Sequence, residues 1–150
     1  MVDRFKRFSF LIFEVSRCWH KLASEEMTKY GLKGPHAIYL TVLHHNPEGL
    51  TSSRLAELCG RDKADVSRAI GLLEEKALVS RQQGNPYRAK LTLTQSGVLA
   101  AEQVIRRASL AVELAGKDIS SEERENFYYA LTSITENLHT LCQDGLPEEL

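Results

Sequence analysis

The fold is decided by Leu50-Thr-Ser-Ser-Arg-Leu-Ala-Glu-Leu-Cys-Gly60 and by the segment that follows it, Asp62-Lys-Ala-Asp-Val-Ser-Arg-Ala-Ile-Gly-Leu-Leu73. Thr51 can cap a short helix, because its hydroxyl can accept a hydrogen bond from a free backbone amide of the first turn. Gly60 can adopt the left-handed conformation that ends this helix at little steric cost. Asp62 can then cap a second helix. The two segments therefore predict two helices joined by a tight turn.

A hairpin is predicted directly after the second helix. In Leu78-Val-Ser-Arg81 and Tyr87-Arg-Ala-Lys-Leu-Thr-Leu-Thr94, the residues Val79 and Arg81, then Leu91 and Leu93, alternate with polar neighbours as in hairpin strands, and Gly84-Asn-Pro86 supplies the loop. This order of elements is the layout of a winged helix-turn-helix, whose second helix enters the DNA major groove. Near the tip of the loop, Arg88 can enter a narrow minor groove and Tyr87 can lie along the DNA backbone. The alternative for the hairpin is a solvated β-turn without a ligand.

The second helix has one apolar face and one uncrowded face. At about 100° per residue, a narrow sector that we expect to be buried holds Val66, Ile70, Leu73 and Ala77. The opposite sector holds Ala64, Ser67, Arg68, Gly71 and Glu75. Three of these five residues are small, so the helix can approach base edges closely, and Arg68 can bind guanine O6 and N7 bidentately. At the flank, Asp65 either accepts a hydrogen bond from cytosine N4 or repels phosphate. The predicted major-groove residues are Ala64, Asp65, Ser67, Arg68 and Gly71.

Positive charge is concentrated around these elements. Between residues 51 and 93 the chain has eight Lys or Arg side chains and five Asp or Glu side chains, although its total net charge is −1. Because salt screens exposed charges beyond about 8–10 Å, a local excess of cations is what phosphate binding needs. The predicted phosphate contacts are Arg54, Arg61, Lys63 and Lys90.

Helices with coiled-coil-like seams are predicted at both ends of the chain. Apolar residues from Phe5 to Leu22 recur at alternating spacings of three and four, and those from Phe127 to Leu141 do the same. Additional apolar residues widen the first seam beyond what one neighbouring helix covers, so we expect burial against a second chain. The predicted dimer interface comprises Phe5, Phe8, Ile12, Phe127, Leu131, Ile134 and Leu138.

Caps are predicted for the two helices that follow the hairpin. Thr94 can cap a helix that runs to about Gly116. The hydroxyl of Ser120 can accept from the Glu123 amide while the Glu123 carboxylate accepts from the Ser120 amide, which is a capping box. The last helix is therefore expected to begin just after Ser120.

Five segments of the chain, taken in order, resemble the MarR family of bacterial transcriptional regulators. They are Gly31-Leu-Lys-Gly-Pro-His36, Leu50-Thr-Ser-Ser-Arg-Leu-Ala, Asp62-Lys-Ala-Asp-Val-Ser-Arg68, Leu73-Glu-Glu-Lys-Ala-Leu-Val79 and Leu91-Thr-Leu-Thr-Gln-Ser-Gly97. The resemblance implies a mainly α fold with a small β-hairpin wing, and a homodimer that binds double-stranded DNA at a pseudo-palindromic operator. It also implies that a small ligand or an oxidant releases the DNA.

The resemblance also suggests a division of the chain. Residues 31–97 would form the winged helix-turn-helix domain, and residues 98–116 a connecting helix. Residues 1–30 and 117–150 would together form the helical dimerisation region. Each of these boundaries is an expectation.

The chain departs from the family pattern at two positions. The family's wing carries an Asp-x-Arg-Asp-Arg-Arg-like run, whereas this chain has Asn85-Pro-Tyr-Arg-Ala-Lys90, so only Arg88 is carried over as a minor-groove residue. Ala77 stands where a glycine commonly ends the recognition helix. If its φ is positive, Ala77 carries strain on the order of 1 kcal/mol.

A possible ligand pocket is predicted where the first two helices meet the DNA-binding region, with Cys18, Trp19, His36 and Tyr39 as its residues. A redox sensor needs an accessible, activated thiol. Because Cys18 is next to the seam residue Trp19, we expect a buried structural cysteine, with a redox sensor of the same family as the alternative. Zinc would need clustered His, Cys or carboxylate ligands, so we expect no metal and no cofactor.

Other function classes are disfavoured. Cys18, Cys59 and Cys142 are odd in number and widely spaced, which indicates reduced thiols in a cytoplasmic protein. No apolar run is long enough to span a membrane. The sequence has no G-x-S-x-G, no phosphate-binding glycine loop and no H-E-x-x-H, so we expect no enzyme. We expect a DNA-binding repressor; the alternative is a winged helix that docks proteins instead of DNA.

Overall fold

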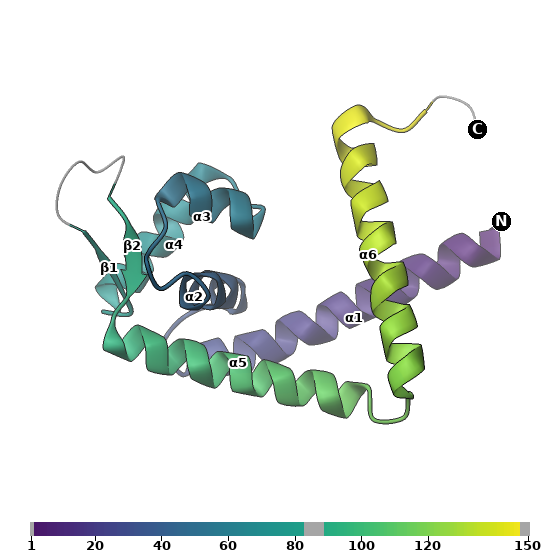
Figure 1. Ribbon diagram of the computed structural model, residues 1–150, viewed down its shortest axis with the longest axis horizontal. Coiled ribbons are helices and arrows are strands. Elements are labelled where there is room, and N and C mark those ends of the chain that lie inside the picture. The colour runs from purple at the N-terminus through teal and green to yellow at the C-terminus, as the bar shows by residue number, and fades with distance from the viewer. Residues whose placement is uncertain (1, 83–88, 148–150) are drawn as a thin grey trace. The chain divides into compact units, whose positions relative to one another are not determined.

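The computed structural model describes residues 2–82 and 89–147, and Figure 1 shows the order of its elements. The predicted class, mainly α with a small β-hairpin, is confirmed. Among the described residues, no helix combines the length and the apolar character that crossing a membrane requires. The elements are α1 (Val2–Thr28), the 3-10 turn η1 (Gly34–His36), α2 (Ala37–His44), α3 (Ser52–Cys59), α4 (Lys63–Glu75), β1 (Val79–Arg81), β2 (Leu91–Leu93), α5 (Gln95–Ala115) and α6 (Ser121–Asp144).

Side-chain caps set the starts of α3 and α4. The Arg54 amide donates to the Thr51 hydroxyl at 3.3 Å, and the Asp65 amide donates to the Asp62 carboxylate at 2.8 Å. Between the two helices, Gly60 has φ 59° and ψ 39°, in the left-handed region. The caps satisfy amides that have no partner within their own helix. The predicted helix-turn-helix is therefore confirmed together with its caps.

The wing is an antiparallel hairpin in which Val79 pairs with Leu93 and Arg81 pairs with Leu91. A further bridge joins it to the segment before α3: the Leu50 amide donates to the Leu91 carbonyl at 3.1 Å, and the Leu91 amide donates to the Leu50 carbonyl at 2.8 Å. The wing is thus held to the helix-turn-helix by backbone hydrogen bonds as well as by the chain itself.

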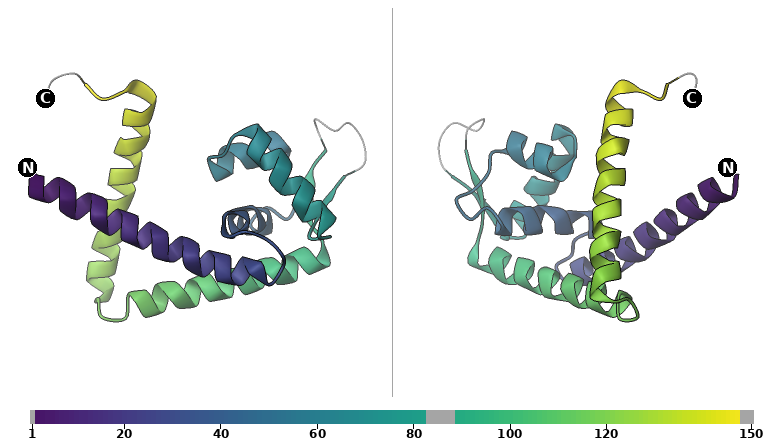
Figure 2. Two further views of the ribbon diagram at one scale, coloured as in Figure 1. Left: turned by 180° about the vertical axis from the view of Figure 1, so that it is seen from behind. Right: turned by 45° about the vertical axis from the view of Figure 1, so that its right-hand side comes forward.

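An apolar core unites these elements. Its largest fully buried side chains are Met27, Leu40, Leu43, Leu55, Val66, Ile70, Leu73 and Leu91. They come from the end of α1 and from α2, α3, α4 and β2, and small residues of α5 complete the cluster. Figures 1 and 2 show α2 in the middle of this region, with α3 on one side and the first turns of α5 on the other. Since each large side chain buried here stabilises by about 1.5–3 kcal/mol, this core fixes the position of α4.

The start of α5 lies directly against the backbone that follows α4. The Leu78 carbonyl accepts from the Thr94 amide at 3.0 Å, and the Thr94 hydroxyl caps α5 by accepting from the Gly97 amide at 3.0 Å. A Cβ at position 97 would overlap the Leu78 carbonyl oxygen. The close contact between α5 and this carbonyl therefore requires glycine.

The chain divides into two compact units, residues 1–110 and 111–150, with the division inside α5. In the second unit the predicted capping box is confirmed: the Ser120 amide donates to the Glu123 carboxylate at 2.8 Å, and the Glu123 amide donates to the Ser120 hydroxyl at 3.3 Å. Arg124 closes the preceding turn by donating to the Gly116 carbonyl at 3.1 Å. No residue of α6 is buried in the single chain.

The expectation that Ala77 belongs to the buried face of the second helix is wrong. Because α4 ends at Glu75, Ala77 lies beyond it and is exposed. Ala69 is buried instead, beside Val66 and Ile70. Ala77 does have the positive φ that the departure from the family pattern implied, at 55°. Because a β-carbon is crowded in this left-handed conformation, Ala77 carries strain on the order of 1 kcal/mol.

The expectation that Cys18 is buried is also wrong for the single chain, in which this residue is exposed. Its neighbour Trp19 is itself 43% exposed. The reason is that no other described part of the single chain covers the seam of α1 at this level.

Candidate nucleic-acid interface

The exposed face of α4 gathers the residues that the sequence proposed for the major groove. Ala64, Ser67, Arg68 and Gly71 are exposed, and Asp65 is half-buried at the edge of the same face. The opposite side of the helix is anchored in the core, so this face is directed outward. A Cβ at position 71 would meet nothing within 4 Å, which shows that the middle of the face is open.

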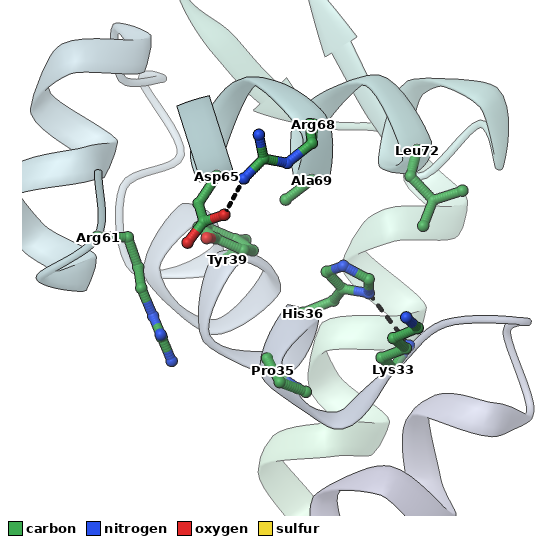
Figure 3. A pocket seen from close by; sticks show the side chains of 9 residues that line it. All are labelled: Lys33, Pro35, His36, Tyr39, Arg61, Asp65, Arg68, Ala69 and Leu72. Atoms are coloured by element: carbon green, nitrogen blue, oxygen red, sulfur yellow. Dashed lines mark hydrogen bonds and ion pairs between the residues drawn. The ribbon is translucent and has the colours of Figure 1, made fainter. Parts of the chain in front are cut away.

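Arg68 is the long donor on this face. Its guanidinium forms an ion pair with Asp65, one turn earlier in the helix, and 70% of the Arg68 side chain is exposed. Figure 3 shows the pair, marked by a dashed line. An exposed pair at this spacing contributes only about 0.3–0.5 kcal/mol to stability. The pair therefore orients the guanidinium without locking it in place.

Cations and one carboxylate surround the start of α4. Arg61 and Lys63 are exposed, and Arg54 of α3 is exposed in an ion pair with Glu57 at 2.7 Å. The carboxylate of Asp62 accepts from the backbone amide at position 65, and this bond lowers the pKa of Asp62. Asp62 is therefore ionised at neutral pH and offsets part of the positive end of the helix dipole.

The wing is connected to both neighbouring segments by its cations. The Lys90 ammonium donates to the Glu48 carbonyl at 3.3 Å, and Lys90 is half-buried. Arg81 forms an ion pair with Glu74 at the end of α4, with 3.2 Å between its Nε and the carboxylate oxygen. The sequence reasoning missed this pair, because the two residues lie on different elements. Tyr87 and Arg88, proposed for the wing contact, lie outside the described residues.

A cavity of about 400 Å³ opens between α4 and the η1–α2 segment (Figure 3). His36 and Tyr39, two of the predicted ligand-pocket residues, line it, whereas Cys18 and Trp19 do not. The lining residues are Lys33, Pro35, His36, Tyr39, Arg61, Asp65, Arg68, Ala69 and Leu72.

The cavity wall is positively charged with an apolar side. The Nδ1 of His36 accepts from the Lys33 amide at 3.1 Å, and burial together with the Lys33 ammonium lowers the pKa of His36. His36 is therefore neutral at pH 7. Burial raises the pKa of Tyr39, which stays a neutral phenol. Lys33, Arg61 and Arg68 carry more charge than Asp65 balances, so the wall suits a small anion with an apolar body.

The thiols differ in accessibility. Burial raises the pKa of Cys59 to about 11, so its thiol is protonated and unreactive at neutral pH. Cys18 and Cys142 are exposed. Within residues 2–82 and 89–147, no three His, Cys, Asp or Glu side chains come together in a way that could hold a metal ion.

A buried carboxylate in α1 is a further feature that the sequence reasoning missed. Glu26 accepts from the Lys29 ammonium at 2.6 Å and lies 3.8 Å from the Arg107 guanidinium of α5. Its other oxygen, Oε1, is buried without a hydrogen-bond partner. Helical periodicity marks apolar seams but does not tell which of the adjacent Glu25 and Glu26 is buried.

The residues proposed for the dimer interface are uncovered in the single chain. In the first unit Phe5 is 70% exposed, and Phe8 and Ile12 are exposed as well. In the second unit Phe127, Ile134 and Leu138 are exposed and Leu131 is half-buried. Apolar surface on this scale is rare on monomeric proteins.

Residues 30–86, from the end of α1 into the wing, match the model of the MarR family. Over this stretch, here called the MarR region, the chain is similar to the MarR family. The MarR region contains η1, α2, the two helices of the helix-turn-helix and β1. The resemblance drawn from five short segments of the sequence is therefore confirmed.

Solved structures of MarR-family regulators share the fold over most of the chain. The MepR–DNA complex of Staphylococcus aureus has 22% identity and a TM-score of 0.78, covering 87% of this chain and 97% of that one. A putative MarR-family regulator of Listeria monocytogenes, solved with a 26mer DNA, has 22% identity and a TM-score of 0.77, covering 93% and 95%. A MarR protein of Peptoclostridium difficile has 21% identity and a TM-score of 0.80, covering 89% and 88%. MepR and the Listeria monocytogenes protein are described as transcriptional regulators, the class of function predicted for this chain.

Proposed function

We propose that this chain is a sequence-specific DNA-binding regulator of transcription, which binds a pseudo-palindromic operator as a homodimer and inserts α4 into the major groove. The observation that carries the proposal is the open face of α4, where small side chains surround one exposed arginine. The MarR region and the fold shared with two regulators solved with DNA support it.

The homodimer follows from the uncovered seams. Residues 1–30 and 117–150 form the dimerisation region in this proposal, residues 31–97 read the DNA, and residues 98–116 connect the two. The exposed apolar residues of α1 and α6 support it, because a second copy would remove them from water. Two recognition helices then meet half-sites about one turn of DNA apart, and the bound dimer represses by covering the promoter.

Release by a small ligand is the third part of the proposal. The cavity beside α4 supports it, because Arg61 and Arg68 line the cavity and are also proposed to contact DNA. A small aromatic carboxylate bound there would neutralise both cations and lower the affinity for DNA. The alternative is release by an oxidant that acts on Cys18, whose thiol is exposed in the single chain.

Substitution of Arg68 tests DNA reading. Sites are first selected from random duplexes with the full chain, and binding is then titrated over a range of salt concentrations. We expect Arg68→Ala to lower the affinity for the selected site at least about tenfold, because a bidentate contact to guanine is lost in each half-site. Arg88→Ala should weaken binding and leave the dimer intact.

Arg17→Ala is the control, because Arg17 is an exposed arginine of α1 paired with Glu14. It should leave the affinity for the selected site unchanged. Wild-type protein whose binding does not fall steeply with salt would contradict the proposal and favour a winged helix that docks proteins.

A further inference from the structure

Asp65 is an anion on a surface where negative charge opposes binding to DNA. It lies on the exposed side of α4 with 45% of its side chain exposed, among the cations Arg61, Lys63 and Arg68. Near a duplex, its carboxylate is repelled by every neighbouring phosphate. The carboxylate therefore lowers the sequence-independent part of the affinity, and its presence on this face needs an explanation.

The helix does not need this carboxylate for its cap. The cap at the start of α4 is made by the Asp62 carboxylate and the backbone amide of residue 65, so it is independent of the Asp65 side chain. The side chain instead accepts from the Arg68 guanidinium. Exposed pairs of this kind add little to stability, so the effect of Asp65 falls on what Arg68 can bind.

We infer that Asp65 is a specificity-determining residue that acts through Arg68, an inference that rests on the proposed DNA binding. Asp65 occupies one edge of the planar guanidinium, which carries five N–H donors in total. The remaining donors suffice for the O6 and N7 acceptors of guanine, so Arg68 reads a base while it keeps its partner.

Asp65 affects the binding of Arg68 to a phosphate differently from its binding to guanine. A phosphate oxygen competes with the carboxylate for the same donors and is repelled by its charge, so the pair weakens contacts between Arg68 and the DNA backbone. Asp65 therefore makes Arg68 poor at binding arbitrary DNA and leaves it able to bind guanine. The expected result is a larger ratio between specific and non-specific affinity.

The chain offers a matched control for this inference. Glu14 precedes Arg17 by three residues in α1, exactly the spacing of Asp65 and Arg68, and the two pairs are both exposed. Glu14→Gln removes one negative charge from the protein without changing α4. Asp65→Asn removes the same charge at the reading face and keeps the shape of the side chain.

The test measures the affinities for a selected site and for a random duplex of equal length, using the full chain. We expect Asp65→Asn to raise the affinity for the random duplex about three- to tenfold and to lower the ratio of the two affinities by about the same factor. Glu14→Gln should change neither value by more than about twofold. Asp65→Glu, which keeps the charge within reach of Arg68, should restore most of the ratio.

A double substitution shows whether Asp65 acts through Arg68. In an Arg68→Ala background, Asp65→Asn should leave the remaining ratio unchanged, and thermal unfolding of each variant shows that it is folded. Loss of the ratio in that background would overturn the inference, because Asp65 would then read a base itself. An unchanged ratio of affinities for Asp65→Asn alone would overturn the inference as well. The proposed function would still stand in that case if the wild-type protein binds the selected site more tightly than the random duplex. Equal binding of both duplexes by wild type would contradict the proposed function itself.

Discussion

The winged region and the terminal helices bury their apolar residues in different ways. In the described residues, buried apolar side chains occur between Met27 and Val104, where they form a continuous cluster. By contrast, α6 has no buried residue, and the seam of α1 from Phe5 to Leu22 is exposed. Both regions contain helices with regular apolar spacing in the sequence. The difference is that one pattern finds its partner within the chain and the other does not.

This difference separates two sources of stability. The winged region has a core of its own, so its folding depends on contacts within a single chain. The seams gain from burial only when another surface covers them, and their contribution then depends on protein concentration. The four predictions below test this separation, in order of decreasing effect.

The largest effect is expected in the core. Leu73→Ala removes a fully buried side chain of α4, and such truncations lower the free energy of unfolding by about 2–5 kcal/mol. Urea denaturation should show this loss at every protein concentration. Leu138→Ala, the same truncation in the exposed seam of α6, should show a loss that shrinks as the protein is diluted. Equal, concentration-independent losses in both variants would remove the distinction between core and seam.

The second effect concerns assembly. Leu138→Glu places a charge in the seam of α6, and burying an unpaired charge in an interface is unfavourable. We expect sedimentation velocity to show monomers, and the affinity for the selected DNA site to fall at least about a hundredfold as the joint binding of two half-sites is lost. Glu136→Gln, a change of charge on the same helix outside the seam, is the control. A dimer that survives the Leu138→Glu change would rule out this seam as the interface.

A third, smaller effect is expected at the end of α4. Because Ala77 has a φ of 55°, Ala77→Gly should relieve strain and raise the free energy of unfolding by up to about 1 kcal/mol. Ala64→Gly, in the exposed first turn of α4, should lower it because glycine is a poor helix former. Urea denaturation of the two variants side by side measures both signs. The prediction fails if Ala77→Gly destabilises the protein as Ala64→Gly does.

The smallest effect is expected at the start of α6. Hydrogen bonds from Ser120 lower the pKa of Glu123 below its ordinary 4.5. Because the folded-state pKa is depressed, the stabilising contribution is present above about pH 4.5 and is lost as the pH falls through the lowered value. Ser120→Ala should move the pKa of Glu123 back toward 4.5 in an NMR titration. The backbone amide at position 120 remains a donor in this variant, so a Glu123 pKa that does not move would show that the Ser120 hydroxyl has no electrostatic effect.

Local signals predicted most of the fold. Thr51, Gly60, Asp62 and Ser120 act within three or four residues of themselves, so the sequence alone locates the helix ends that they cap. The wrong expectation that Ala77 lies on the buried face of α4 also came from a local signal. The helical period tells which residues share a face but not where the helix stops. The end of α4 carries no glycine, so only the resemblance to the family, in which a glycine commonly stands at the place of Ala77, indicated where this helix stops.

The candidate site was predicted less completely than the fold. The exposed face of α4 follows from the helical period, whereas the pairing of Asp65 with Arg68 was not predicted, although their spacing of three residues allows it. The pair of Glu74 with Arg81 and the burial of Glu26 depend on how separate elements pack, and that information is not local. The cavity has the same origin, because it lies between segments that are distant in the sequence.

The close contact at Gly97 restricts how this protein can vary. The fit is between two stretches of main chain, so no larger side chain elsewhere can compensate for a β-carbon added at this point. A library of all amino acids at position 97 should therefore yield folded protein with glycine alone, whereas a library at the open position 71 should yield many folded variants. Gly71 and Gly97 both lie in α-helices, yet we expect position 71 to tolerate other amino acids and position 97 to accept glycine alone.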